Sequence, residues 1–398
     1  MPFRQPRSHS RVYLPRQLIH GLLASLVIAL APLPAPAQTV VRVPAPVAAA
    51  QLPAVDSARE RVREWVATDN LAGASVAVGI DGQIVWAEGF GWSDLEQRVP
   101  VTPLTRFRIG SVSKPLTSVA VGLLYERGKI DLDAPVQKYV PSFPKKQWPI
   151  STRQLMGHIA GIRHYRGDEF LSSKHYDSIL EGLEIFARDS LLFRPGTKYS
   201  YSTYGWNLVS AVVEAAAGEP FLDFMRREVI APLGLRHTVP GYMASIIPDR
   251  VRFYEHNKEG RLVNAPYVDN SYKWAGGGFL STPSDLVRFG FAMLDGKVLQ
   301  PKTIEMLWTP LRLESGKSTG YGLGWNVRDV NGHRVISHSG GSVGGTTAFM
   351  IFPEQRMVVA VTTNLTDAET GPIANEVAEL FEPAGKAGAP GAKGGRGR

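Results

Sequence analysis

Runs of apolar residues near both ends of the chain predict β-strands. At the amino end, residues 73–80 and 83–92 are strand-like and flank Asp81-Gly82, the strongest short-range signal for a hairpin turn. At the carboxyl end, three further runs cover residues 334–338, 346–352 and 357–364. Five strands divided between the two ends, with helical patterns between them, predict an α+β fold with one five-stranded antiparallel sheet whose halves meet across the chain.

Apolar residues spaced three and four apart predict helices before, between and after these strands. Such helices are expected at residues 57–68, 176–189, 204–217, 220–228 and 372–381. The region from about 141 to 320 is then an inserted, mostly helical lobe. The folded body as a whole is expected to cover residues 56–382, a length that supports a large core.

The stretch 107–114, F-R-I-G-S-V-S-K, opens a further helix and holds a candidate nucleophile. Apolar residues follow it at helical spacing, and Gly128 is a stop signal, so Ser111 lies at the helix start. Lys114, three residues on, projects on roughly the same side. A lysine whose pKa is lowered by burial can take the serine proton, and a helix amino end favours an oxyanion. A capped surface helix is the alternative, because S-x-x-K alone is a weak signal.

Two other stretches contain residue types that could complete such a site. Tyr201, followed by Ser202 and Thr203, could carry a lowered pKa beside a lysine and exchange protons with a serine or a leaving group. The alternative is a core aromatic cluster. His338 is followed by Ser339, Gly340 and Gly341 at a strand end, where glycines let a substrate backbone approach and leave an N–H free to donate. A histidine satisfied within the strand is the alternative.

The composition of the amino-terminal segment predicts export. Residues 1–37 combine four arginines, an apolar run at 21–31 and a small-residue site ending at Ala37, a pattern typical of a secretory signal peptide. An uncleaved membrane anchor is the alternative, but the run is short and prolines interrupt its continuation. Residues 38–55 are Ala/Pro/Val-rich and are interpreted as a linker. The protein is therefore expected to be periplasmic or secreted, with no stable membrane anchor after cleavage.

The formal net charge of +8 does not indicate a nucleic-acid partner. Residues 1–37 contain four Lys or Arg and no acid, and so do residues 383–398, which leaves the body between them neutral. The second of these segments is a Gly/Ala/Lys/Arg tail that we expect to be disordered. The chain has no cysteine, which excludes disulfides and thiolate metal sites, and it has no H-E-x-x-H motif. A zinc enzyme is not expected.

Taken in order, S-x-x-K, then Y-x-x, then H-x-G on a late strand, the chain resembles the serine β-lactamase and penicillin-binding protein superfamily, on its class C and D,D-carboxypeptidase side. Two stretches, G-I-R-H-Y at 161–165 and D-N-S-Y-K-W-A-G-G-G at 269–278, look closest to the mitochondrial serine β-lactamase-like proteins and their bacterial relatives. The resemblance covers the whole folded body. It implies a β-lactamase/transpeptidase-like fold and no metal or other cofactor.

The resemblance also implies catalytic roles. Ser111 would be the acylated nucleophile and Lys114 its proton partner. Tyr201 would shuttle protons and activate the hydrolytic water. The N–H groups of Ser111 and Gly341 would form the oxyanion hole.

Substrate binding by Thr203, His338, Ser339 and Gly340 is implied in the same way, with two departures from the usual pattern. Thr203 occupies the usual asparagine position, and a hydroxyl cannot offer the paired carbonyl and amide that hold an acyl-amide group. His338 replaces a lysine, which weakens the fixed positive charge at neutral pH. We therefore expect a protonated His338 to help carboxylate-bearing substrates only below about pH 6.5.

These observations predict an exported serine hydrolase that acts through an acyl-enzyme on a peptide amide or an ester, with weak β-lactamase activity. The alternative is a low-turnover β-lactam-binding sensor, or a self-assembling scaffold with the same fold. A homo-oligomer or filament is implied by the resemblance alone. The sequence does not identify the acyl group or the leaving group.

Overall fold

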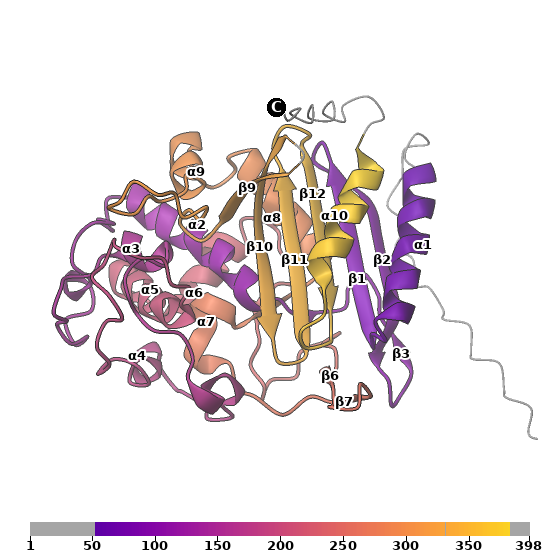
Figure 1. The fold of residues 1–398 in the computed structure, drawn as a ribbon, viewed down its shortest axis with the longest axis horizontal. Helices are drawn as coiled ribbons and strands as arrows, with labels where there is room; N and C mark the ends of the chain where they lie inside the picture. The colour runs from indigo at the N-terminus through magenta and orange to yellow at the C-terminus, as the bar shows by residue number, and fades with distance from the viewer. Residues whose placement is uncertain (1–51, 331, 383–398) are drawn as a thin grey trace, which may run out of the picture. The chain divides into compact units, whose positions relative to one another are not determined.

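A computed structural model describes residues 52–330 and 332–382 and is built around an antiparallel sheet (Figure 1). The sheet has seven strands in the order β3-β2-β1-β12-β11-β10-β9. In chain order they are β1 (Gly73–Ile80), β2 (Gln83–Asp94), β3 (Val99–Pro100), β9 (Asn326–Val330), β10 (His333–Ser342), β11 (Gly345–Phe352) and β12 (Met357–Thr363). The prediction of one sheet built from both chain ends is confirmed, because β1 pairs with β12.

The predicted count of five strands is wrong. The five predicted strands are the centre of the sheet, and β3 and β9 add one short strand at each edge. β3 is only two residues long, and β9 reads N-V-R-D-V with no buried residue, so neither gives an apolar pattern. The hairpin between β1 and β2 forms as predicted. Asp81 and Gly82 have φ of 49° and 84°, the positive values that a tight two-residue hairpin turn requires.

Helices cover both faces of the sheet. In Figure 1, α1 (Leu52–Thr68) and α10 (Thr370–Phe381) lie in front of it and α8 (Pro283–Leu294) lies behind. Side chains alternate along each strand, so Val76 and Val78 pack toward α1 and α10, while Ala77 packs toward the opposite face. Because β1 is buried on both faces, its sequence is almost continuously apolar.

The start of α1 corrects the predicted linker. The helix begins at Leu52, inside the stretch 38–55, and Val55 is already buried in the core under α1. The Ala/Pro/Val composition resembles a linker, but Pro53 falls in the first turn, where a helix tolerates proline. The predicted signal peptide, the rest of the linker and the basic tail at 383–398 lie outside the described residues.

Residues 141–320, predicted as a mostly helical lobe, contain helices of 4 to 15 residues and several strands of two or three residues. The remaining helices of the structure are α2 (Ser113–Glu126), α3 (Thr152–Met156), α4 (Ile179–Leu183), α5 (Thr203–Ala217), α6 (Phe221–Phe224), α7 (Trp274–Gly277) and α9 (Pro301–Leu307). The remaining strands are β4 (Phe107–Arg108), β5 (Val239–Pro240), β6 (Tyr254–His256), β7 (Leu262–Asn264) and β8 (Phe279–Ser281). Of the helices within 141–320, α8 packs directly on the sheet. Among residues 52–330 and 332–382, no helix combines the length and the apolar character needed to cross a membrane.

The 3-10 turn Gly110–Val112, which leads into α2, packs backbone to backbone against β10. Gly110 has φ of 48°, and a Cβ added there would lie 2.6 Å from the carbonyl oxygen of Gly341. A Cβ on Gly340 would lie 1.9 Å from the carbonyl oxygen of Ile109. Only glycine fits at both positions. This contact holds the turn that contains Ser111 against the end of β10.

Candidate active site

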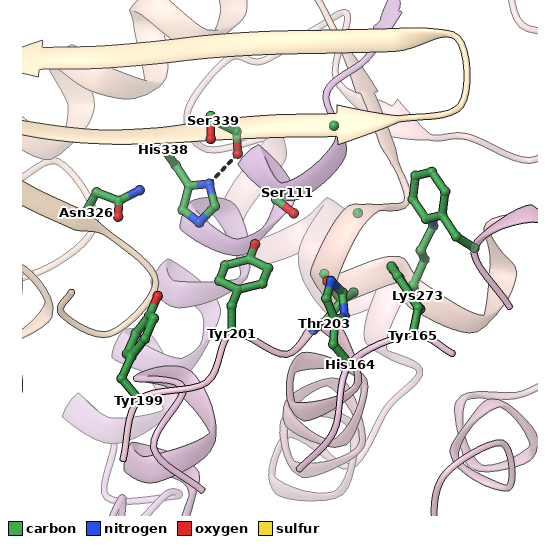
Figure 2. A pocket seen from close by; sticks show the side chains of 14 residues that line it. Ser111, His164, Tyr165, Tyr199, Tyr201, Thr203, Lys273, Asn326, His338 and Ser339 are labelled. Carbon is green, nitrogen blue, oxygen red and sulfur yellow. Dashed lines mark hydrogen bonds between the residues drawn. The ribbon is translucent and has the colours of Figure 1, made fainter. Parts of the chain in front are cut away.

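A cavity of about 560 Å³ lies where the start of α2, the edge of β10 and the segments around α5 and α7 meet (Figure 2). Six of the predicted site residues line it: Ser111, Tyr201, Thr203, His338, Ser339 and Gly341. Lys114 does not line the cavity and is fully buried. Gly340 does not line it and is instead packed against Ile109. The structure therefore brings together residues that are up to about 230 positions apart in the chain.

Lys114 is held directly against Ser111. The 3-10 turn Gly110–Val112 leads into α2, and Lys114 Nζ lies 2.8 Å from Ser111 Oγ, 2.8 Å from the carbonyl oxygen of Gly276 and 3.3 Å from Thr203 Oγ1. Burial, reinforced by the charge of Lys273, lowers the pKa of Lys114 well below its ordinary value. A neutral amine fits these contacts, because it can donate to two oxygens and accept the hydroxyl proton of Ser111 with its lone pair. Lys114 can therefore act as a base.

Tyr201 lies beside this pair, but its pKa differs from the prediction. Its ring centroid is 4.8 Å from Lys114 Nζ, and its hydroxyl interacts with the hydroxyl of Ser111. Burial raises the pKa of Tyr201 well above its ordinary value, and the interaction with Ser111 only partly offsets this. The predicted lowering of this pKa is wrong, because desolvation by burial dominates and the Lys114 amine, being neutral itself, does not counter it. Tyr201 is a neutral phenol, suited to relay a proton and not to serve as the resting base.

The edge of β10 offers a backbone N–H to the cavity. The two-residue turn after Ser342 makes Ser342 and Gly345 a hydrogen-bonded pair, and backbone groups then alternate between the two edges of the strand. By this alternation, the N–H groups of Ser339 and Gly341 point away from β11. In the described chain β9 pairs with β10 only at residues 333–337, so the N–H of Gly341 faces the cavity.

His338 lines the cavity as a neutral side chain. Its Nδ1 lies 2.5 Å from the carbonyl oxygen of Ser339, so Nδ1 carries the proton, and Nε2 then accepts from the Tyr321 hydroxyl at 2.8 Å. Burial, with a contribution from Lys114, lowers the pKa of His338 to about 3. The predicted gain of charge below about pH 6.5 is therefore wrong. The expectation used the ordinary pKa of histidine, whereas this imidazole is only 3% exposed.

Thr203 is the first residue of α5, after the capping residue Ser202, whose hydroxyl accepts from the N–H of Gly205. The side chain of Thr203 contacts the amine of Lys114, and its N–H donates to His164 Nδ1 at 3.3 Å. His164 therefore carries its proton on Nε2. The structure thus places Thr203 against the base as well as at the cavity wall.

Several cavity residues were missed as site residues by sequence reasoning: His164, Tyr165, Phe170, Tyr199, Lys273, Gly276, Gly277 and Asn326. Five of them fall in G-I-R-H-Y and D-N-S-Y-K-W-A-G-G-G, the two stretches that supported the resemblance. The similarity of these two stretches to the family was therefore the sequence signal that could have identified them as site residues. Among the described residues, no three His, Asp or Glu side chains lie close enough together to hold a metal ion.

A family model described as "Beta-lactamase" matches residues 58–381, which is nearly the whole described region. The chain belongs to the Beta-lactamase family. It is a serine hydrolase of this family, with the α+β fold of β-lactamases and transpeptidases. The family match and the observed sheet confirm the resemblance found in the sequence.

Three similar proteins illustrate the breadth of the Beta-lactamase family. The chain is 34% identical over 397 residues to the mitochondrial serine beta-lactamase-like protein LACTB of Homo sapiens, covering 76% of this chain and 72% of that protein. It is 28% identical over 234 residues to the teichoic acid D-alanine hydrolase of Staphylococcus aureus (strain MRSA252), covering 59% and 57%. Among solved structures, the octameric penicillin-binding protein homologue from Pyrococcus abyssi superposes with a TM-score of 0.72 at 27% identity, covering 82% and 77%.

Proposed function

We propose that this serine hydrolase cleaves a peptide amide or an ester through an acyl-enzyme on Ser111, and that it is exported. The 2.8 Å contact between Ser111 Oγ and the amine of Lys114, fully buried and of lowered pKa, carries the proposal. The teichoic acid D-alanine hydrolase supports an ester or amide as the substrate class. Export rests on the composition of residues 1–37.

Acylation uses the three predicted catalytic side chains. Lys114 Nζ takes the proton of the Ser111 hydroxyl as Oγ attacks the carbonyl carbon. The carbonyl oxygen becomes an oxyanion, which the N–H groups of Ser111 and Gly341 stabilise. When the bond to the leaving group breaks, the Tyr201 hydroxyl donates a proton to that group and recovers one from the Lys114 ammonium. The product is an ester on Ser111 with Lys114 neutral again.

Deacylation reuses the same groups. Among the described residues that line the cavity there is no carboxylate that could serve as a separate base. A water molecule gives its proton through Tyr201 to Lys114 and attacks the acyl carbon. The bond to Ser111 Oγ then breaks, and Oγ takes the proton back from Lys114.

Replacing Tyr201 by phenylalanine is expected to lower kcat/KM by about 10²-fold, because the hydroxyl relays the proton in acylation, and to slow deacylation as well, because it relays the proton of the attacking water. The ring and its contacts remain, so the variant should fold normally. Stopped-flow measurement of acylation and deacylation with a chromogenic ester separates the two steps. Wild-type rates for both would reassign Tyr201 as a core aromatic.

A substrate panel tests the predicted weakness toward β-lactams. Thr203 lacks the carbonyl and amide groups with which an asparagine would hold the substrate's acyl-amide group. His338 is neutral, and both of its ring nitrogens are already hydrogen-bonded. Each of these two positions therefore loses a substrate interaction of about 1–3 kcal/mol. We expect kcat/KM for a cephalosporin about 30-fold to 10⁴-fold below that of an efficient β-lactamase. A D-Ala-D-Ala peptide and a p-nitrophenyl ester should be measured on the same preparation. A cephalosporin value near about 10⁶ M⁻¹s⁻¹ would contradict this reading.

A second candidate function, self-assembly into a low-turnover scaffold, is supported by the octameric state of the Pyrococcus abyssi homologue. Size-exclusion chromatography with light scattering measures the oligomeric state, and turnover of a chromogenic ester measures activity. A large assembly without turnover would favour the scaffold. Turnover that depends on Ser111 favours the hydrolase in any oligomeric state.

A further inference from the structure

Lys273 is a second lysine in the active-site cavity, and the acyl-transfer steps above do not use it. It ends the 3-10 turn Ser271–Lys273 that precedes α7, is only 2% exposed and lines the same cavity as Ser111. In the view of Figure 2, Lys273 and His338 lie on opposite sides of Ser111. The two ends of a substrate that spans the nucleophile would therefore meet different chemistry.

The ammonium of Lys273 is surrounded by aromatic rings. Its Nζ lies 4.4 Å from the ring centroid of Phe170, 5.2 Å from that of Tyr272 and 5.4 Å from that of Tyr165. Within the described residues, Lys273 Nζ makes no hydrogen bond and no ion pair. Ring faces stabilise a cation only partly, so burying an ammonium without an anion is unfavourable.

The charged groups near Lys273 are not counter-ions. Burial, followed by the positive charge of Arg108, lowers the pKa of Lys273 to about 7. Glu169 precedes Phe170 in the chain, but its carboxylate oxygens already accept from Arg163 and Tyr204. Among the described residues that line the cavity, no side chain provides an anion to pair with Lys273.

We propose that Lys273 recognises an anionic group of the substrate, namely a carboxylate on the side of the scissile carbonyl opposite His338. The inference rests on the proposed function and specifies its substrate class. The aromatic rings exclude water around the ammonium, which strengthens its attraction for a carboxylate that enters the cavity. Lys273 thus offers the cavity a positive charge, which the neutral His338 on the other side of Ser111 does not supply.

A matched pair of substrates tests the proposal. N-acetyl-glutamyl and N-acetyl-glutaminyl p-nitroanilide are nearly isosteric and differ in one carboxylate. We expect the wild-type protein to prefer the glutamyl substrate by about 10-fold or more in kcat/KM, the size of a charge-assisted hydrogen bond. Lys273→Met should reduce this ratio to about 1 through KM, and Lys273→Arg should retain most of it. The exposed Lys302 provides the control Lys302→Met, which should leave the ratio unchanged.

Lys273 also lowers the pKa of Lys114, and the experiment separates the two effects. Loss of that electrostatic influence would shift the pH–rate profiles of both substrates equally, whereas loss of anion recognition affects only the glutamyl substrate. An unchanged ratio in Lys273→Met, or an equal loss for both substrates, overturns the proposal.

Calorimetric binding keeps the test independent of turnover. N-acetyl-glutamate should bind the wild-type protein more tightly than N-acetyl-glutamine does, and Lys273→Met should abolish the difference. Preferential binding without hydrolysis of any substrate would reject the proposed function and retain the role of Lys273. Equal binding of the two ligands would reject the role of Lys273.

Discussion

Replacing Ser111 by alanine is expected to lower kcat/KM for a p-nitrophenyl ester by about 10⁴-fold or more and to abolish labelling by a fluorophosphonate. Ser111 combines a hydroxyl 2.8 Å from a buried amine with a backbone N–H at a helix start. Removing Oγ therefore removes the atom that forms the acyl bond. Mass spectrometry of the labelled protein identifies the modified peptide, and ester turnover on the same preparation gives the rate.

The matched control for this experiment is Ser342→Ala. The Ser342 hydroxyl is buried and has no hydrogen-bond partner among the described residues, so its loss should affect neither labelling nor turnover. Both serines border the contact between β10 and the start of α2, which makes the comparison local. Phosphonate labelling that survives in Ser111→Ala would reject the nucleophile assignment.

Local sequence spacing predicted the parts of the site that depend on one helical turn. Ser111 and Lys114 are three residues apart at a helix start, so their contact needs no information about the rest of the chain. The β1–β2 hairpin is local in the same sense, since Asp81-Gly82 fixes its turn. The assignment of Tyr201 and His338 to the same cavity came from the resemblance, because more than 130 residues separate them in the chain.

Properties that depend on burial could not be predicted from the sequence. The pKa values of Tyr201 and His338 differ from expectation because both side chains are desolvated by segments distant in the chain. Lys273 went unrecognised for the same reason. Nothing in its local sequence indicates that Phe170 and Tyr165, over 100 residues earlier, enclose its ammonium in the cavity.

The second large effect is expected for Lys114→Met, which should lower the acylation rate by about 10³-fold or more. In the wild-type protein, kcat/KM should fall as the pH drops through the pKa of Lys114, since only the neutral amine can accept the serine proton. The variant should lose this dependence together with the activity. Lys146→Met is the matched control, because Lys146 is a partly buried lysine that donates to the carbonyl oxygens of Ala187 and Asp189, away from the cavity.

The same substitution should stabilise the fold at neutral pH. The folded protein holds the pKa of Lys114 below its ordinary value of 10.5, so below that pH the unfolded chain binds a proton that the folded chain resists. Above about pH 10.5 Lys114 is neutral in both states and its burial does not reduce the free energy of unfolding. As the pH falls from 10.5 toward the lowered pKa, the unfolded chain gains a proton that the folded protein does not, and the free energy of unfolding decreases. A methionine of similar length removes that penalty, and we expect the free energy of unfolding at pH 7 to rise by about 1 kcal/mol or more.

Urea unfolding at pH 7 and pH 10 measures the difference in the free energy of unfolding between the variant and the wild type, which should shrink at the higher pH. A variant that is less stable than wild type at pH 7 would show that the contacts of Lys114 with Gly276 and Thr203 outweigh the cost of burying its amine.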